Sequence, residues 1–350
     1  MLPLAAAAQR AGHEVVIATS GSLVAQVEQH GFKTWQVGGE EYCAPSVEGK
    51  NWIPGLPLDV SAKLRAPGLM RLAEAWAPDV VAHEPIDLAG PIIATRIRAR
   101  HLIHSLGPML PTPMWAVLSS QVEQVYREWN LPRLMDILAD ATYLDICPPS
   151  LQNKYIKMWK RISPLRPVCF EPAGGETLPA SMAALPYADT IHVTMGTVVN
   201  KAPSLFEVAL AGLRDLAVNI IITVGPDIDP ALLGPQPPHI IAERFITHRL
   251  LLPRCRLVIN HAGNGTVLST LSYGIPLLLL PQGADQFQTA SSCARAGVAL
   301  VLKSAEITPE AVGQAVRRLL TEPSFSSAAR HLQSEIAGMP PPEQVVESSA

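Results

Sequence analysis

Short runs of β-branched and other apolar residues alternate along the chain with segments of helical character, and this alternation limits the fold more than any other feature. A strand, a helix and a second strand form the βαβ unit, which builds parallel sheets covered by helices on both faces. We therefore expect an α/β protein with doubly wound parallel sheets. The strand-like runs are 14–19, 79–83, 101–105, 190–195, 219–225, 256–260 and 276–281.

The chain length predicts two domains, because 350 residues exceed what a single hydrophobic core usually organises. The alternation breaks between 161 and 188, where five prolines and a Gly-Gly pair leave little helical period. We place a first domain at 1–165, a linker at 166–187 and a second domain at 188–350.

Charge and cysteine usage exclude several classes of protein. A net charge of -3 lacks the basic excess that nucleic-acid binding needs. Two uncharged stretches, 102–120 and 262–284, contain prolines and glycines that favour buried, turn-interrupted elements over membrane spans. Five cysteines without C-x-x-C spacing indicate reduced thiols. These observations predict a soluble cytoplasmic protein.

The segment with most chemical content joins a predicted strand at 256–260 to a helix through a glycine-containing turn. Gly263 and Gly265 let the backbone approach a ligand, and the free N–H groups of a helix N-terminus attract phosphate. Thr266 can cap the helix, and His261 can donate a hydrogen bond to a phosphate oxygen. The alternative is an ordinary turn with a structural histidine, since neither the G-x-G-x-x-G nor the G-K-[ST] fingerprint is complete.

Polar side chains also follow the next predicted strand, 276–281. Asp285 and Gln286 come shortly after its carboxyl end, where doubly wound folds bind ligands. A carboxylate and an amide together accept from and donate to sugar hydroxyls. The sequence therefore places phosphate-binding and sugar-binding groups after successive strands.

Four motifs, in this order and spacing, carry a family resemblance: TIHVTMGTV (190–198), ERFITHRLLLP (243–253), the strand-HxGxGT-helix segment and PQGADQF (281–287). They resemble the donor half of a family-1 glycosyltransferase of the GT-B type, above all the actinobacterial enzymes that glycosylate antibiotic aglycones. The resemblance is specific through 187–338 and rests in the first half on 2–19 and 77–91.

The resemblance implies two Rossmann-like domains facing a cleft, with a nucleotide-diphosphate sugar (UDP or dTDP) in the second domain and an apolar hydroxylated acceptor in the first. It implies inverting sugar transfer without a metal ion or other cofactor. The donor-binding residues that it implies are Gly196, Thr197, Phe245, Ile246, His261, Gly263, Asn264, Gly265, Thr266, Asp285 and Gln286.

Three positions depart from the family pattern. Ala262 replaces a glycine after the motif histidine, Phe245 replaces the usual tryptophan, and His248 stands where a glutamine is common. Phe245 can still stack on a nucleotide base, although a phenylalanine in the hydrophobic core is the alternative. The D-x-D at Asp227 and Asp229 is interpreted as a solvated turn and not as a metal site.

The largest departure concerns the front of the first domain. In relatives a strand and a loop with the general-base histidine precede the helix that begins here at Leu2. We therefore expect a missing strand and a truncated first domain. By resemblance, Glu84 is the acid that would orient the base, with an exposed loop carboxylate as the alternative; Asp87 is the second catalytic candidate.

Two other functions stay open from the sequence. A catalytically impaired nucleotide-sugar-binding or auxiliary protein fits the absence of the base, and a GT-B sugar-nucleotide epimerase fits the donor motifs. Partners expected are a nucleotide sugar and a hydrophobic aglycone, with an auxiliary protein or a homodimer left open.

Overall fold

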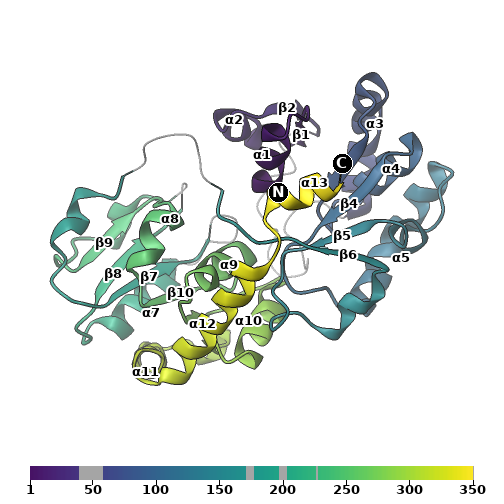
Figure 1. The fold of residues 1–350 in the computed structure, drawn as a ribbon. Helices are drawn as coiled ribbons and strands as arrows, with labels where there is room; N and C mark the ends of the chain where they lie inside the picture. The colour runs from purple at the N-terminus through teal and green to yellow at the C-terminus, as the bar shows by residue number, and fades with distance from the viewer. Residues whose placement is uncertain (39–57, 171–176, 197–202, 226–227, 350) are drawn as a thin grey trace. The chain divides into compact units, whose positions relative to one another are not determined.

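The computed structural model describes residues 1–38, 58–170, 177–196, 203–225 and 228–349 (Figure 1). Thr197 and Asp227 lie outside the described residues, so their predicted roles stay predictions. Every strand pairing among the described residues is parallel. Helices connect these strands, so the predicted α/β fold of doubly wound parallel sheets is confirmed. None of the described helices is long and apolar enough to cross a membrane.

Two compact units divide the chain. The first contains Met1–Cys147, Gln152–Arg166 and Pro340–Ala350, and the second contains Pro148–Leu151 and Pro167–Met339. These units differ from the predicted domains 1–165 and 188–350 in the assignment of Pro148–Leu151 and of the end of the chain. The end of the chain belongs to the first unit because Val345 packs there against Leu102, Leu144 and Leu165. The linker at 166–187 stays a prediction.

The second unit is built on one six-stranded sheet with the order β12-β11-β10-β7-β8-β9. Its two central strands and the strand beside β7 are buried at every position, as expected for apolar runs covered on both faces. The strands are β7 (Thr190–Thr194), β8 (Asn219–Thr223), β9 (Ile240–Glu243), β10 (Leu257–Asn260), β11 (Leu277–Leu279) and β12 (Ala299–Val301).

The order of this sheet contains a reversal. From β7 the chain adds β8 and β9 on one side, and then returns to add β10, β11 and β12 on the other. Neighbouring strands β7 and β10 therefore send their following loops to opposite sides, which opens a crevice at their carboxyl ends. In doubly wound folds this is where ligands bind.

The helices of the second unit follow the predicted alternation (Figure 1). Thr308 caps α11 by accepting a hydrogen bond from the N–H of Ala311, and Pro309 and Pro323 begin α11 and α12 at the first helical position, where proline is favoured. The helices are α7 (Pro203–Leu213), α8 (His248–Leu251), α9 (Asn264–Ser272), α10 (Gln286–Arg295), α11 (Pro309–Thr321) and α12 (Pro323–Gly338).

The first unit has a four-stranded sheet, β3-β4-β5-β6, and a separate two-stranded sheet, β1-β2. Among the described residues β1 pairs with β2 alone, and all four of its residues are only half-buried. The strands are β1 (Val16–Thr19), β2 (Lys33–Gln36), β3 (Val80–His83), β4 (Arg100–His104), β5 (Thr142–Asp145) and β6 (Arg161–Pro164). The helices are α1 (Leu2–Arg10), α2 (Gly21–Gln29), α3 (Leu58–Trp76), α4 (Gly90–Ile97), α5 (Thr112–Glu128), α6 (Leu134–Leu138) and α13 (Pro342–Ser349).

Candidate functional site

The loops after β7 and β10 meet around the imidazole of His261. A Cβ placed on Gly196 would lie 2.9 Å from Nε2 of His261, and one placed on Gly263 would lie 2.5 Å from the same atom. Both distances are shorter than real Cβ contacts, so each position needs a glycine. Gly196 also has a φ of +77°, in the region that favours glycine. The structure thus brings together three of the predicted site residues at the reversal of the sheet.

The imidazole of His261 is neutral at physiological pH. Burial lowers its pKa to about 4, because the surrounding protein disfavours the charged ring. Its Nδ1 atom is buried and has no hydrogen-bond partner among the described residues. A neutral imidazole carries one N–H donor, which suits a hydrogen bond to an anionic oxygen.

Helix α9 presents its N-terminus beside this histidine. Gly263 is the N-cap residue, and no side chain caps the helix. Thr266 therefore does not act as the cap that the sequence predicted, because it lies within the first turn and not before it. The N–H groups of Asn264, Gly265 and Thr266 are in that first turn, where helix geometry provides no intrahelical acceptor. Such a terminus attracts an anion such as phosphate.

Backbone strain marks the loop that enters α9. Ala262 is fully buried and has a φ of 69°, a left-handed conformation that non-glycine residues rarely adopt. Its N–H donates to Oδ1 of Asn260 at 2.7 Å, which holds the turn in place. Strain of this kind concentrates at functional sites. The glycine that the family pattern has at this position would adopt the same conformation without strain.

Asp285 lies next to the same helix N-terminus. Nδ2 of Asn264 donates to Oδ2 of Asp285 at 2.7 Å, so the residue that opens α9 holds the carboxylate that precedes α10. Burial raises the pKa of the Asp285 carboxyl, and the hydrogen bond from Asn264 opposes this effect. The phosphate-binding and sugar-binding groups that the sequence predicted are therefore directly connected.

Gln286 follows β11 as predicted, but its side chain makes contacts that the sequence did not predict. It is buried, and its Oε1 accepts hydrogen bonds from the backbone N–H groups of Gln282 (2.8 Å) and Gly283 (3.1 Å). The side-chain oxygen is thus used to hold the loop between β11 and α10. Its contribution to sugar binding stays a prediction, and its structural role could be seen only in three dimensions.

The residues predicted to bind the nucleotide base follow β9. Phe245 is 63% exposed, which excludes the alternative that it belongs to the hydrophobic core. Ile246, the next residue, is buried. An exposed aromatic ring beside a buried neighbour offers a flat apolar face on which a base can stack. His248, in place of the family's glutamine, lies with its ring against buried His192 at 5.9 Å between centroids.

The two carboxylates predicted in the first unit lie in the loop after β3. Glu84 has an exposed side chain, although the protein atoms around its carboxyl displace some water and so raise the pKa of that group by desolvation. Asp87 forms an ion pair with Arg65 at 3.2 Å and accepts a hydrogen bond from the N–H of Ala89 at the start of α4. Asp87 is therefore engaged in holding its own loop, whereas Glu84 has an exposed side chain.

A pair of histidines in the first unit was not anticipated. Nε2 of His83 and Nε2 of His101 are 2.6 Å apart on the adjacent strands β3 and β4. Nδ1 of His83 donates to the carbonyl of Glu84, so Nε2 of His83 accepts a hydrogen bond from Nε2–H of His101. Burial lowers the pKa of both rings, that of His101 to about 3. The sequence shows no sign of this pair, because His83 and His101 become neighbours only through strand pairing.

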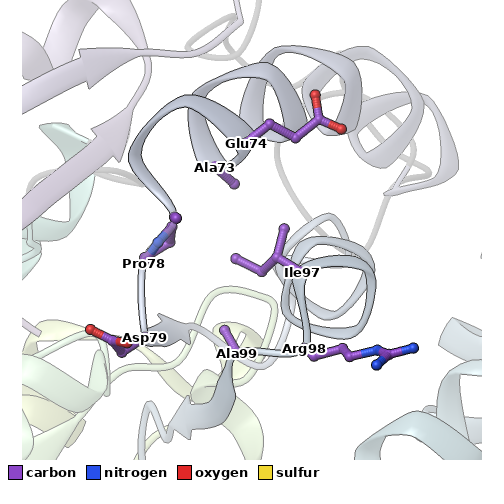
Figure 2. A pocket seen from close by; sticks show the side chains of 8 residues that line it. Ala73, Glu74, Pro78, Asp79, Ile97, Arg98 and Ala99 are labelled. Atoms are coloured by element: carbon purple, nitrogen blue, oxygen red, sulfur yellow. The ribbon is translucent and has the colours of Figure 1, made fainter.

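Two cavities occur at the opposite, amino-terminal edge of the four-stranded sheet. Figure 2 shows the first, of about 300 Å³, lined by residues such as Glu74, Asp79 and Arg98 around the ends of α3 and α4. The second, of about 590 Å³, is lined by residues that include His101 and Arg161. Neither contains a predicted site residue. The carboxyl edges of the sheets, not these cavities, carry the candidate site.

Comparisons with known proteins indicate the same family as the sequence motifs of the site. Residues 207–350 match the model "Erythromycin biosynthesis protein CIII-like, C-terminal domain", and residues 59–175 match the N-terminal domain of the same family. L-demethylnoviosyl transferase of Streptomyces niveus is 30% identical over 100% of this chain and 93% of that protein. The 10-deoxymethynolide desosaminyltransferase of Streptomyces venezuelae is 26% identical over 99% of this chain and 92% of that protein.

Solved structures agree over the full length. Spinosyn Rhamnosyltransferase SpnG covers 100% of this chain and 95% of its own, with a TM-score of 0.84 and 28% identity. Its complex with thymidine diphosphate has the same TM-score and 29% identity. The fold, the motif order and a relative at 30% identity over the whole chain lead to one conclusion. The chain belongs to the family-1 glycosyltransferases of the GT-B fold, in the group of the erythromycin biosynthesis protein CIII.

Proposed function

We propose that this glycosyltransferase moves a sugar, with inversion at the anomeric carbon, from a nucleotide-diphosphate sugar to a hydroxyl of an apolar natural-product aglycone. The observation that carries the proposal is the position of His261 between Gly196 and Gly263, at the reversal of the six-stranded sheet. The names of two relatives support the substrate class, since the 10-deoxymethynolide desosaminyltransferase and the tylactone mycaminosyltransferase are each named for the sugar that they transfer and for its acceptor.

The donor diphosphate binds at the N-terminus of α9 in this proposal. The first-turn N–H groups and the N–H of His261 donate to its oxygens, and the helix dipole favours the negative charge that grows as the leaving group departs. Because His261 is neutral, it contributes a directed hydrogen bond and not a fixed charge. These donors let transfer proceed without a metal ion or other cofactor.

The sugar lies against Asp285, and the base stacks on Phe245. An ionised carboxylate accepts hydrogen bonds from sugar hydroxyls, which orients the anomeric carbon toward the acceptor. The acceptor oxygen forms a bond to that carbon as the bond to the diphosphate breaks, and the electron pair leaves with the diphosphate. In-line displacement of this kind inverts the configuration. The acceptor proton passes to a base in the first unit.

Glu84 is the candidate in the first unit that would orient or supply this base. Its carboxyl is exposed, and a raised pKa makes the carboxylate a stronger base. Asp87 is the second candidate, although its carboxylate is already engaged in an ion pair with Arg65. We place the reaction in the cytoplasm, in keeping with the thiols of Cys255 and Cys293, which are not in disulfides.

The test incubates the chain with a dTDP-sugar or a UDP-sugar, with and without a panel of macrolide aglycones. A glycosylated aglycone that forms only when both substrates are present supports the proposal, and the anomeric coupling constant of the product shows whether inversion occurs. Conversion of the nucleotide sugar without an aglycone would identify an epimerase. Binding of thymidine diphosphate without any turnover would identify a nucleotide-sugar-binding protein.

A further inference from the structure

Thr289 connects to the sugar-binding carboxylate through one other side chain. Its Oγ1 donates to Oδ1 of Asn264 at 2.8 Å, the shorter of its two contacts, the other being to the backbone carbonyl of Asp285 at 3.2 Å. Nδ2 of Asn264 donates to Oδ2 of Asp285 at 2.7 Å. Thr289 is 1% exposed, so this hydroxyl exchanges no hydrogen bond with bulk water. The three side chains form one chain of hydrogen bonds from the interior of α10 to the carboxylate.

The direction of these bonds decides the orientation of Asn264. An asparagine amide can rotate by half a turn, which exchanges its donor and its acceptor. An ionised carboxylate only accepts, so Asp285 faces the Nδ2 end of the amide and leaves Oδ1 of Asn264 toward the Thr289 hydroxyl. With no hydroxyl at position 289, Oδ1 loses the one partner that it has among the described residues, and the Asn264 side chain is held only by its contact with Asp285.

The carboxylate has no other side-chain anchor among the described residues. Asp285 occupies the N-cap position of α10, but its side chain does not cap the helix. Apart from a hydrogen bond to its own backbone, the carboxylate is therefore held by Asn264, and Asn264 is held in turn by Thr289. The spacing of four residues places Thr289 one helical turn after Asp285, under the start of α10.

We propose that Thr289 is a positioning residue for sugar transfer, which sets the orientation of the Asp285 carboxylate through Asn264. This inference rests on the proposed function, because it assigns Asp285 to the sugar of the donor. Thr289 itself touches neither the sugar nor the diphosphate. Its effect should therefore appear in the handling of nucleotide sugar and not in the binding of the diphosphate.

Thr289→Val removes the hydroxyl and keeps the shape of the side chain. We expect affinity for thymidine diphosphate to be unchanged, whereas kcat/KM for the dTDP-sugar falls about fivefold, as one neutral hydrogen bond implies. Thr289→Ser keeps the hydroxyl and should restore most of the activity. Because the hydrogen bond from Asn264 lowers the pKa of Asp285, Thr289→Val should also raise that pKa, which carboxyl ¹³C NMR measures without any substrate.

Thr270→Val is the matched control. Thr270 is equally buried, and its hydroxyl donates only to the backbone carbonyl of Thr266 in α9. The two valine variants should lose similar stability, but only Thr289→Val should change the Asp285 pKa and kcat/KM. Equal kinetics in wild type and Thr289→Val, or equal losses in both valine variants, would overturn the inference. An inactive wild type that still gives the pKa shift would instead count against the proposed function alone.

Discussion

In each unit, the candidate residues lie at the edge of the larger sheet where the parallel strands end. The two edges differ in whether their polar side chains are engaged with other groups of the protein. In the second unit, Gly196 and Gly263 leave space around His261, and no side chain caps α9. In the first unit, Asp87 is bound to Arg65, and His83 is bound to His101. The edge in the second unit keeps hydrogen-bond donors available for a ligand, whereas the edge in the first unit uses these polar groups in contacts within the protein.

This difference shows that topology alone does not make a site. Both sheets are parallel, so the carboxyl ends of their strands meet at one edge in each. The six-stranded sheet adds a reversal between β7 and β10, and the four-stranded sheet runs in sequence order from β3 to β6. Donors become available where the strand order reverses and glycines keep side chains away. The following predictions test that explanation.

Replacing Gly196 with alanine should have the largest effect. The new Cβ would lie 2.9 Å from Nε2 of His261, and the φ of +77° would strain any other residue. Displacing the imidazole and straining the turn together should weaken binding of thymidine diphosphate by about 2–4 kcal/mol, measured by calorimetry. Gly338→Ala, which adds a Cβ where no atom lies within 4 Å, is the control and should bind normally.

His261→Ala should weaken binding of thymidine diphosphate by about 1.5–3 kcal/mol, the range for a hydrogen bond to a charged group. The wild-type affinity should not fall as pH rises from about 5.5 to 7.5, since a pKa of about 4 leaves His261 neutral throughout. Calorimetry across this range checks both statements. A steady loss of affinity with rising pH would show that the imidazolium is the binding form.

Asp285→Asn should lower turnover about tenfold, while thymidine diphosphate binds as in wild type. The amide keeps an oxygen that can accept from Asn264, but it loses the charge that strengthens hydrogen bonds to sugar hydroxyls. Steady-state kinetics and calorimetry separate the two effects. Equal losses for the diphosphate and the nucleotide sugar would mean that the substitution damages the unit as a whole.

Asp87→Asn should lower the free energy of unfolding by about 1 kcal/mol, because it weakens a half-buried ion pair and the hydrogen bond from Ala89.

Glu84→Gln should leave stability unchanged, since the residue is exposed and no hydrogen bond of its carboxylate is seen in the described part of the chain. Thermal unfolding measures both. If Glu84→Gln alone abolishes transfer, Glu84 is the carboxylate that serves the reaction.

Ala262→Gly should have the smallest effect, a change of less than about 1 kcal/mol in the free energy of unfolding. Glycine removes the strain at a φ of 69°, but it also loses a buried methyl group and gives the unfolded chain more freedom. Thermal unfolding measures the change in stability, and calorimetry measures the binding of thymidine diphosphate. A gain or loss above about 2 kcal/mol would show that the alanine is itself important to the second unit.

The sequence by itself determined the elements and the sites that lie within one element. The strand at 256–260, the glycine-containing turn and the start of α9 are local, so apolar runs, turn residues and helix starts predict them. The position of Asp285 after β11 was predicted from the same local pattern. The alternation of apolar runs and helical segments predicted the α/β class, and the order of the motifs carried the family resemblance.

The tertiary structure decided which distant groups meet. Gly196 reaches His261 only because β7 pairs with β10, and Asp285 reaches Asn264 only because α9 and α10 begin side by side. The same holds for Arg65 beside Asp87, and for Gln286, whose oxygen turns toward the backbone. These contacts depend on strand order and side-chain packing, which non-local burial sets and no local pattern encodes.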